Sequence, residues 1–278
     1  MIRSLSPVTA GAGLSLSEQV ALCARHDFAG LEISVQAAHA MGLEAAQELF
    51  RSHGVAPVTF GLPVEWRKDD AIFERDLERL PELAAFAARL GVSRCTTWVL
   101  PDNGAPASEY AQISSARFEK IARVFAAHEV ALGLEFLGPK MFRPTENFWF
   151  YDIAGALEVA EEINRKIGAE TVGLLVDCWH WHASGGNLMD LASCPIERVV
   201  HVHINDAPRG VSRENLEDNV RELPGETGEI DIAGFLSTLR ALGYSGAVAV
   251  ETFSEELKKL TPDEAAHRAS EAMKRVGV

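Results

Sequence analysis

The chain has 278 residues, of which 47% are hydrophobic, and it carries a net charge of −14. Such a negative field repels polyanions, so we expect no nucleic-acid partner. No run of about 18 apolar residues occurs, and the N-terminal residues lack the apolar segment of a signal peptide, so we expect a cytoplasmic protein without a membrane partner. The four cysteines form no CxxC pair, which favours reduced and buried thiols.

Short β-branched runs alternate with longer segments of helical period along the whole chain. This alternation is typical of parallel strands that are joined by helices. Strands are predicted at residues 2–9, 30–34, 56–60, 92–99, 130–136, 172–177, 199–203 and 247–251. Helices are predicted from about residue 17 and at residues 43–53, 70–90, 115–128, 153–167, 232–242 and 262–276. Pro81 is expected to kink the helix at 70–90 or to start a new one.

Eight strand–helix units favour a closed (β/α)8 TIM barrel that forms a single domain over residues 1–278, because barrels of this size commonly have one core. The alternative is an open doubly wound sheet. Its glycine-rich turn after the first strand is absent, since Gly11 and Gly13 are not followed by a third glycine at the required spacing. The collection of polar residues at strand ends also favours the barrel.

Four metal-ligating residue types stand at the ends of four consecutive predicted strands: Glu135, Asp177, His203 and Glu251. Each has an ordinary explanation when taken alone, as a surface ion-pair member or a hydrogen-bonded core histidine. The carboxyl ends of barrel strands meet at one open face, so we expect the four side chains to converge. Three carboxylates and one imidazole suit a single divalent cation, with Mn²⁺ expected first and Mg²⁺, Co²⁺ or Zn²⁺ as alternatives.

Three further residues are candidates for binding substrate. Lys140 lies in a long loop, 137–150, that follows the fifth strand, and long loops at this face commonly wall a substrate site. An exposed lysine is more often only a solvated charge. Trp66, in the loop after the third strand, is expected near the barrel mouth, where core packing explains it equally well. Arg209 belongs to a second long loop, 205–229, which follows the seventh strand.

The second half of the chain resembles the xylose isomerase-like TIM barrels, which include sugar 3-epimerases, hydroxypyruvate isomerase, inosose dehydratase and, more distantly, AP endonucleases. The resemblance rests on four motifs: Val176-Asp-Cys-Trp-His180, His201-Val-His-Ile-Asn-Asp-Ala-Pro-Arg209, Leu223-Pro-Gly-Glu-Thr-Gly-Glu-Ile-Asp231 and Gly243-Tyr-Ser-Gly-Ala-Val-Ala-Val-Glu251. They are similar to the family's D-x-x-H, H-x-H-x-x-[DE]-x-x-R, P-G-x-G and G-Y-x-G patterns. The glycine loop here has one additional residue between its glycines.

This resemblance implies that the four strand-end residues bind one metal ion. It also implies that Glu135 and Glu251 act as acid and base on opposite faces of the substrate, while His180 and Arg209 hold the oxygens of a sugar. A metal that polarises a carbonyl and the neighbouring hydroxyl makes the intervening C–H acidic. Proton return to the other face gives an epimer, and proton transfer to the adjacent carbon gives an isomer.

The leading hypothesis is therefore a metal-dependent isomerase or epimerase that acts on a ketose, keto-sugar or related polyol. A lyase of the inosose or dehydroshikimate dehydratase type uses the same scaffold and remains an alternative. A non-catalytic sugar-binding barrel would lack a ligand, and all four are present. Nuclease members carry an additional Asp-x-His, where this chain has Asn219-Val-Arg221, which disfavours a nuclease. The sequence leaves open whether the substrate is phosphorylated and whether the chain forms a homodimer or a homotetramer.

Overall fold

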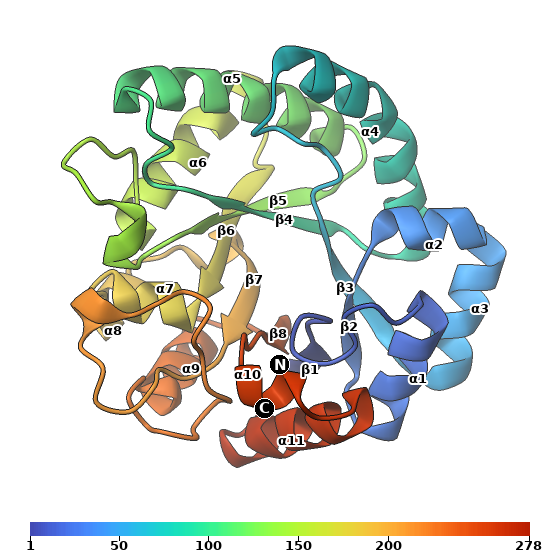
Figure 1. Cartoon of the computed structure of the whole chain (residues 1–278). Helices are drawn as coiled ribbons and strands as arrows, with labels where there is room; N and C mark the ends of the chain where they lie inside the picture. The colour runs from blue at the N-terminus through green and yellow to red at the C-terminus, as the bar shows by residue number, and fades with distance from the viewer.

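Eight parallel strands form a closed barrel in the computed structural model, which describes residues 1–278 (Figure 1). Each strand pairs with the next, and β8 closes the ring by pairing with β1 from Ile2 with Ala247 to Leu5 with Val250. This confirms the predicted (β/α)8 barrel. The strands are β1 Ile2–Leu5, β2 Gly30–Ile33, β3 Ala56–Gly61, β4 Arg94–Val99, β5 Ala131–Phe136, β6 Val172–Asp177, β7 Val199–Ile204 and β8 Ala247–Val250.

Helices surround the barrel on its outer face (Figure 1). They are α1 Leu16–Arg25, α2 Val35–Met41, α3 Leu43–His53, α4 Asp70–Leu90, α5 Ala107–Ala126, α6 Ile153–Ile167, α7 Cys178–Ala183, α8 Leu188–Ala192, α9 Ile232–Ala241, α10 Glu255–Lys258 and α11 Pro262–Arg275. Three 3₁₀ turns accompany them: η1 Lys140–Phe142, η2 Ile196–Arg198 and η3 Arg213–Asn215. None of the helices combines the length and the apolar character needed to cross a membrane.

The helix predictions were wrong in two respects. The short helices α2, α7, α8 and α10 were not predicted, because each is too short to establish a helical period in the sequence. The helix predicted at 115–128 is α5, which begins earlier, at Ala107. Of the two alternatives at Pro81, no new helix starts there, since α4 continues through it, and a kink stays a prediction. Pro81 is exposed, and the buried residues Leu80 and Leu83 beside it hold the helix against the barrel. Packing on this face outweighs the loss of one backbone hydrogen bond.

Two of the strands that carry the site, β6 and β7, are buried along their whole length. All six residues of β6 and all six of β7 are buried, as expected for parallel strands covered by side chains on one face and helices on the other. Asp177 pairs with His203 in the register between these two strands, so both side chains reach the same level at the barrel mouth. The register of the strands therefore determines where these polar side chains lie along the barrel axis.

Candidate metal centre

The structure brings the four predicted ligands together at the carboxyl ends of β5 to β8. One ligand atom from each of Glu135, Asp177, His203 and Glu251 lies within 4.8 Å of the others. Glu135 and His203 each precede the last residue of their strands, Asp177 ends β6, and Glu251 directly follows β8. Asp177 is fully buried, and Glu135 is only 8% exposed. The arrangement therefore concentrates three carboxylates and one imidazole at largely buried positions of the barrel mouth.

Two atoms of this cluster have no hydrogen-bond partner although they are buried: Glu135 Oε1 and His203 Nδ1. They face each other at 3.8 Å. Buried polar atoms without partners are rare and costly. Burial raises the pKa of Glu135 well above its usual value, and the nearby carboxylate of Glu251 raises it further. A divalent cation would satisfy both unpaired atoms and offset the carboxylate repulsion, so the residues present fit a metal ion.

Arg221 is a residue of this site that the sequence analysis did not identify. Its side chain is 2% exposed, and Nη1 donates to Asp177 Oδ2 at 2.8 Å and to Glu251 Oε2 at 3.1 Å. Nη2 donates to Asp218 Oδ1 at 2.8 Å. The guanidinium thus partly neutralises two of the candidate metal ligands. In the sequence, Arg221 stands out only because it occupies a position where nuclease members carry an additional ligand.

The loop that carries Arg221 is held by the side chain of Asp206. Its carboxylate accepts hydrogen bonds from the backbone N–H groups of Thr227 at 3.1 Å, Gly228 at 2.8 Å and Ile230 at 3.0 Å. The backbone N–H of Arg221 donates to the carbonyl of Phe253, two residues after Glu251. These bonds tie the loop to the end of β8, so the guanidinium is directed into the cluster.

His180 lies beside the cluster because Asp177 caps the short helix α7. The carboxylate of Asp177 accepts from the backbone N–H of Trp179 at 2.8 Å, which starts the helix directly after the strand. His180 Nδ1 lies 3.4 Å from the Gly138 amide nitrogen, and His180 Nε2 lies 3.7 Å from Glu135 Oε1. A side chain at Gly138 would come within 2.1 Å of the His180 carbonyl oxygen, so only glycine permits this approach.

Burial and the charge of Arg221 lower the pKa of His180 well below its usual value. The imidazole is therefore neutral, and only one of its nitrogens can accept a hydrogen bond: Nδ1 faces the Gly138 N–H at 3.4 Å, and Nε2 faces Arg221 Nη2 at 3.4 Å. His180 thus contacts the guanidinium at the edge of the cluster.

The structure does not bring the other three predicted residues to the cluster. Trp66 is 1% exposed, donates through Nε1 to Thr97 Oγ1 at 3.0 Å, and packs in the core. Arg209 is exposed and donates to the Thr227 carbonyl. Lys140 is exposed and lines a separate hollow. The path of each loop, which the sequence does not reveal, decides these positions.

Two cavities meet at the candidate metal centre, and Glu135, Glu251 and Trp98 line both. The smaller, of about 200 Å³, also contains His180 and Arg221. The larger, of about 520 Å³, extends toward β1 to β4, and none of its lining residues is Lys or Arg. Its hydroxyl and amide side chains are Ser6, Gln19, Ser34, Gln36, Thr59, Thr96 and Thr97. Together the cavities offer the space that a small polar molecule needs.

Residues 20–276 match the family model of the xylose isomerase-like TIM barrel. The chain belongs to this family. It is 26% identical over 272 residues to the inosose isomerase of Bacillus velezensis. The alignment covers 94% of this chain and 92% of that protein. This result confirms the predicted resemblance and relates the chain to an enzyme.

Two solved structures have the same fold over nearly the whole chain. A xylose isomerase domain protein from Alicyclobacillus acidocaldarius has a TM-score of 0.88 and 28% identity, with 99% of this chain and 98% of that chain covered. The IolI protein with a bound zinc atom has a TM-score of 0.82 and 24% identity, with 99% and 98% covered. Both comparisons agree with the closed barrel described above.

Proposed function

We propose that this protein is a divalent-metal-dependent isomerase or epimerase that moves a proton beside the carbonyl of a neutral polyol ketone. The observation that carries the proposal is the convergence of Glu135, Asp177, His203 and Glu251, with two buried atoms left unpaired. Mn²⁺ and Zn²⁺ suit this ligand set, and the zinc atom in the IolI structure supports including zinc. The chemistry supplied by a bound cation is Lewis-acid polarisation of the substrate carbonyl.

The two glutamates are suited to different roles because their surroundings shift their pKa values in opposite directions. Without a cation, burial and the nearby Glu251 raise the pKa of Glu135, which favours its protonated form. Burial alone would raise the pKa of Glu251, but His203 and Arg221 lower it, which keeps it ionised. Pairs of carboxyl groups separated in this way commonly serve as acid and base. We assign Glu251 as the base and Glu135 as the acid.

In this assignment, the Glu251 carboxylate takes the proton from the carbon next to the carbonyl, and the electron pair moves onto the carbonyl oxygen. Glu135 then returns a proton. Return to the opposite face of the same carbon gives an epimer. Return to the former carbonyl carbon gives an isomer when the hydroxyl proton of the neighbouring carbon passes to the former carbonyl oxygen. The His180 imidazole and the Arg221 guanidinium line the smaller cavity and would hold substrate oxygens. Arg221 takes the role that the sequence had suggested for Arg209.

The lining of the larger cavity supports a substrate without phosphate or carboxylate. Its carboxyl side chains are Glu32, Glu135 and Glu251, its one imidazole is that of His203, and no Lys or Arg lines it. A second anion placed there would be repelled by these carboxylates and would find no guanidinium or ammonium partner. Hydroxyl and amide groups instead match the hydroxyl groups of a polyol. A neutral inosose-type ketone or a free keto-sugar fits this cavity better than dehydroshikimate, which carries a carboxylate.

Deuterium exchange tests the proposed chemistry. Purified protein loaded with Mn²⁺ or Zn²⁺ is incubated in D₂O with inososes and free ketoses, and the products are followed by NMR after the metal is removed. We expect deuterium at the carbon next to the carbonyl, together with an epimer or isomer. Loss of water with an unsaturated product would instead identify a lyase.

Substitution of the proposed base tests the proton transfer, and the metal content of each variant is measured because Glu251 is also a candidate ligand. Glu251→Gln should reduce the exchange rate by roughly 10²- to 10⁴-fold, because the amide keeps the shape of the side chain and cannot accept the proton. The exposed Glu255→Gln serves as the control, and it should exchange at the wild-type rate. The proton-transfer mechanism would be wrong if Glu251→Gln retained full exchange. It would also be wrong if the wild type exchanged no proton in any ketone that stabilises it against heat.

A further inference from the structure

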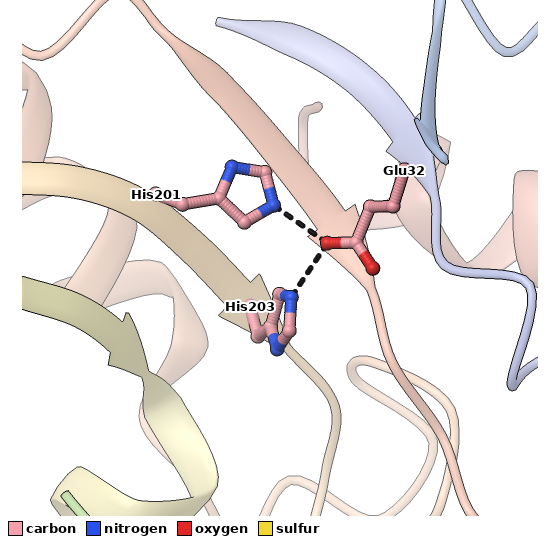
Figure 2. Close-up of side chains that lie close together, drawn as sticks. All are labelled: Glu32, His201 and His203. Atoms are coloured by element: carbon pink, nitrogen blue, oxygen red, sulfur yellow. Dashed lines mark hydrogen bonds and ion pairs between the residues drawn. The ribbon is translucent and has the colours of Figure 1, made fainter. Parts of the chain in front are cut away.

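Glu32 on β2 crosses the barrel mouth to reach two histidines of β7 (Figure 2). Its Oε1 lies 2.7 Å from His201 Nε2 and 2.6 Å from His203 Nε2. His201 is fully buried, and the side chain of Glu32 is 15% exposed. Neither the proton transfer nor the metal ligation described above involves Glu32 or His201. Their close contact with a candidate ligand therefore calls for a separate explanation.

The hydrogen bond to Glu32 determines which nitrogen of His203 can bind a metal. An imidazole nitrogen that donates to a carboxylate carries the hydrogen, so in the neutral ring the other nitrogen has a free lone pair. For His203 that other nitrogen is Nδ1, which lies 3.3 Å from Glu251 Oε2 and 3.8 Å from Glu135 Oε1. The bond also fixes the rotation of the ring, so Nδ1 points into the cluster.

His201 supports Glu32 from a second direction. Residues two apart on a strand face the same side, so both histidines of β7 point into the barrel and reach the same carboxylate oxygen. The rings meet edge to face, with centroids 5.2 Å apart and planes at 85°. Figure 2 shows the second carboxylate oxygen of Glu32 directed away from both rings. The shared oxygen is thus held by two donors while the carboxylate as a whole lines the larger cavity.

We infer that Glu32 is a positioning residue that holds His203 with the hydrogen on Nε2 and the free lone pair on Nδ1, directed at the metal, with His201 fixing the carboxylate. This inference rests on the proposed metal centre. Carboxylate–histidine pairs of this kind commonly raise metal affinity by 10- to 100-fold. A rival explanation is a second metal bound by Glu32, His201 and His203. That arrangement requires lone pairs on both Nε2 atoms and puts the hydrogen of neutral His203 on Nδ1.

Metal affinity tests the inference without relying on activity. Zinc dissociation constants are measured by chelator competition for the wild type and for Glu32→Ala, Glu32→Gln and Glu82→Gln. Glu82 is a matched control, because its carboxylate pairs with His39 at 3.2 Å outside the candidate metal centre. We expect Glu32→Ala to bind zinc about 10- to 100-fold more weakly. Glu32→Gln should fall between Ala and wild type because its amide oxygen still accepts a hydrogen bond, and Glu82→Gln should be unchanged.

Nitrogen NMR of the zinc-loaded, ¹⁵N-histidine-labelled protein reports the nitrogen that carries hydrogen. We expect the His203 signal, identified by its loss in His203→Ala, to show zinc on Nδ1 and hydrogen on Nε2. Equal zinc affinity in wild type and both Glu32 variants would overturn the inference but leave the proposed metal centre intact. Zinc on Nε2, or two zinc ions per chain, would support the rival explanation, and either result would also overturn the inference about Glu32. A wild type that binds no metal would refute the proposed function itself.

Discussion

Arg221 and the proposed cation share two carboxylates, so replacing Arg221 should cost more stability without the metal than with it. The guanidinium contacts Asp177 at 2.8 Å, Glu251 at 3.1 Å and Asp218 at 2.8 Å. Arg221→Met preserves most of the apolar stem and removes the charge. In the metal-free protein, the substitution leaves buried carboxylates without their positive partner, which typically costs about 3–5 kcal/mol.

Arg221→Met should lose less stability in the metal-loaded protein, because the cation neutralises Asp177 and Glu251. Only the contact with Asp218, whose side chain is 17% exposed, then loses its partner. One partly exposed, charge-assisted contact contributes about 1–2 kcal/mol. The difference between the two states is therefore about 2–3 kcal/mol. By linkage, the metal should bind Arg221→Met about 30- to 150-fold more tightly than the wild type.

Urea unfolding in EDTA and in saturating Zn²⁺, together with chelator competition, measures both quantities. Arg117→Met is a suitable control, since Arg117 Nη1 donates to the carbonyls of Trp66 and Lys68, away from the candidate metal centre, and Nη2 donates to Asp70. Arg117→Met should lower the free energy of unfolding by the same amount with and without metal. The reasoning would fail if Arg221→Met lost equal stability in both states. It would also fail if the variant bound the metal more weakly than the wild type.

Three further outcomes are expected. Asp177→Asn and His203→Ala should retain less than about one tenth of the wild-type metal content after chelation and reloading, since each removes a ligand; undiminished content in both would contradict the metal centre. Burial raises the pKa of Cys23 to about 12 and of Cys194 to about 11. Both thiols should therefore resist a disulfide reagent at pH 8 until the protein unfolds. Rapid labelling of the folded protein would contradict this expectation. Burial lowers the pKa of His182 to about 4, against about 6.5 when unfolded, so the unfolded chain binds more protons between these values. The contribution of His182 to the free energy of unfolding should therefore be complete above pH 6.5 and fall by about 1–2 kcal/mol toward pH 4. In urea unfolding at several pH values, His182→Gln should reduce this dependence of stability on pH. An unchanged dependence would exclude His182 as its source.

The four candidate ligands were predictable because topology alone brings them together. Each stands at the end of a short apolar run, and the carboxyl ends of parallel strands in a closed barrel share one face. Glu135 and Glu251 are 116 positions apart in the numbering, yet no knowledge of side-chain packing was needed to place them side by side. Glu32 stands in the same kind of position, next to the last residue of β2, so the same rule applied to every strand would have included it.

Arg221 could not be predicted in the same way. The loop after β7 carries three arginines, Arg209, Arg213 and Arg221, and their spacing does not distinguish them. The hydrogen bonds of Asp206 to backbone N–H groups further along the loop determine which arginine enters the barrel mouth. Such bonds depend on the path of the backbone, which a motif comparison does not contain. The family pattern therefore suggested Arg209, which lies exposed.

The two halves of the barrel have different tasks in this arrangement. Strands β5 to β8 supply the charged atoms that fit a metal, whereas β1 to β4 and their loops supply most of the neutral groups of the larger cavity. Metal affinity depends on charge and ligand geometry, while substrate choice depends on neutral hydrogen-bonding groups some distance from the ligands. We therefore expect changes among Ser34, Gln36 and Thr59 to alter which polyol the proposed enzyme prefers without removing a candidate metal ligand. Glu32 is different, because it belongs to the cavity wall and also holds a candidate ligand, so a substitution there affects both tasks together.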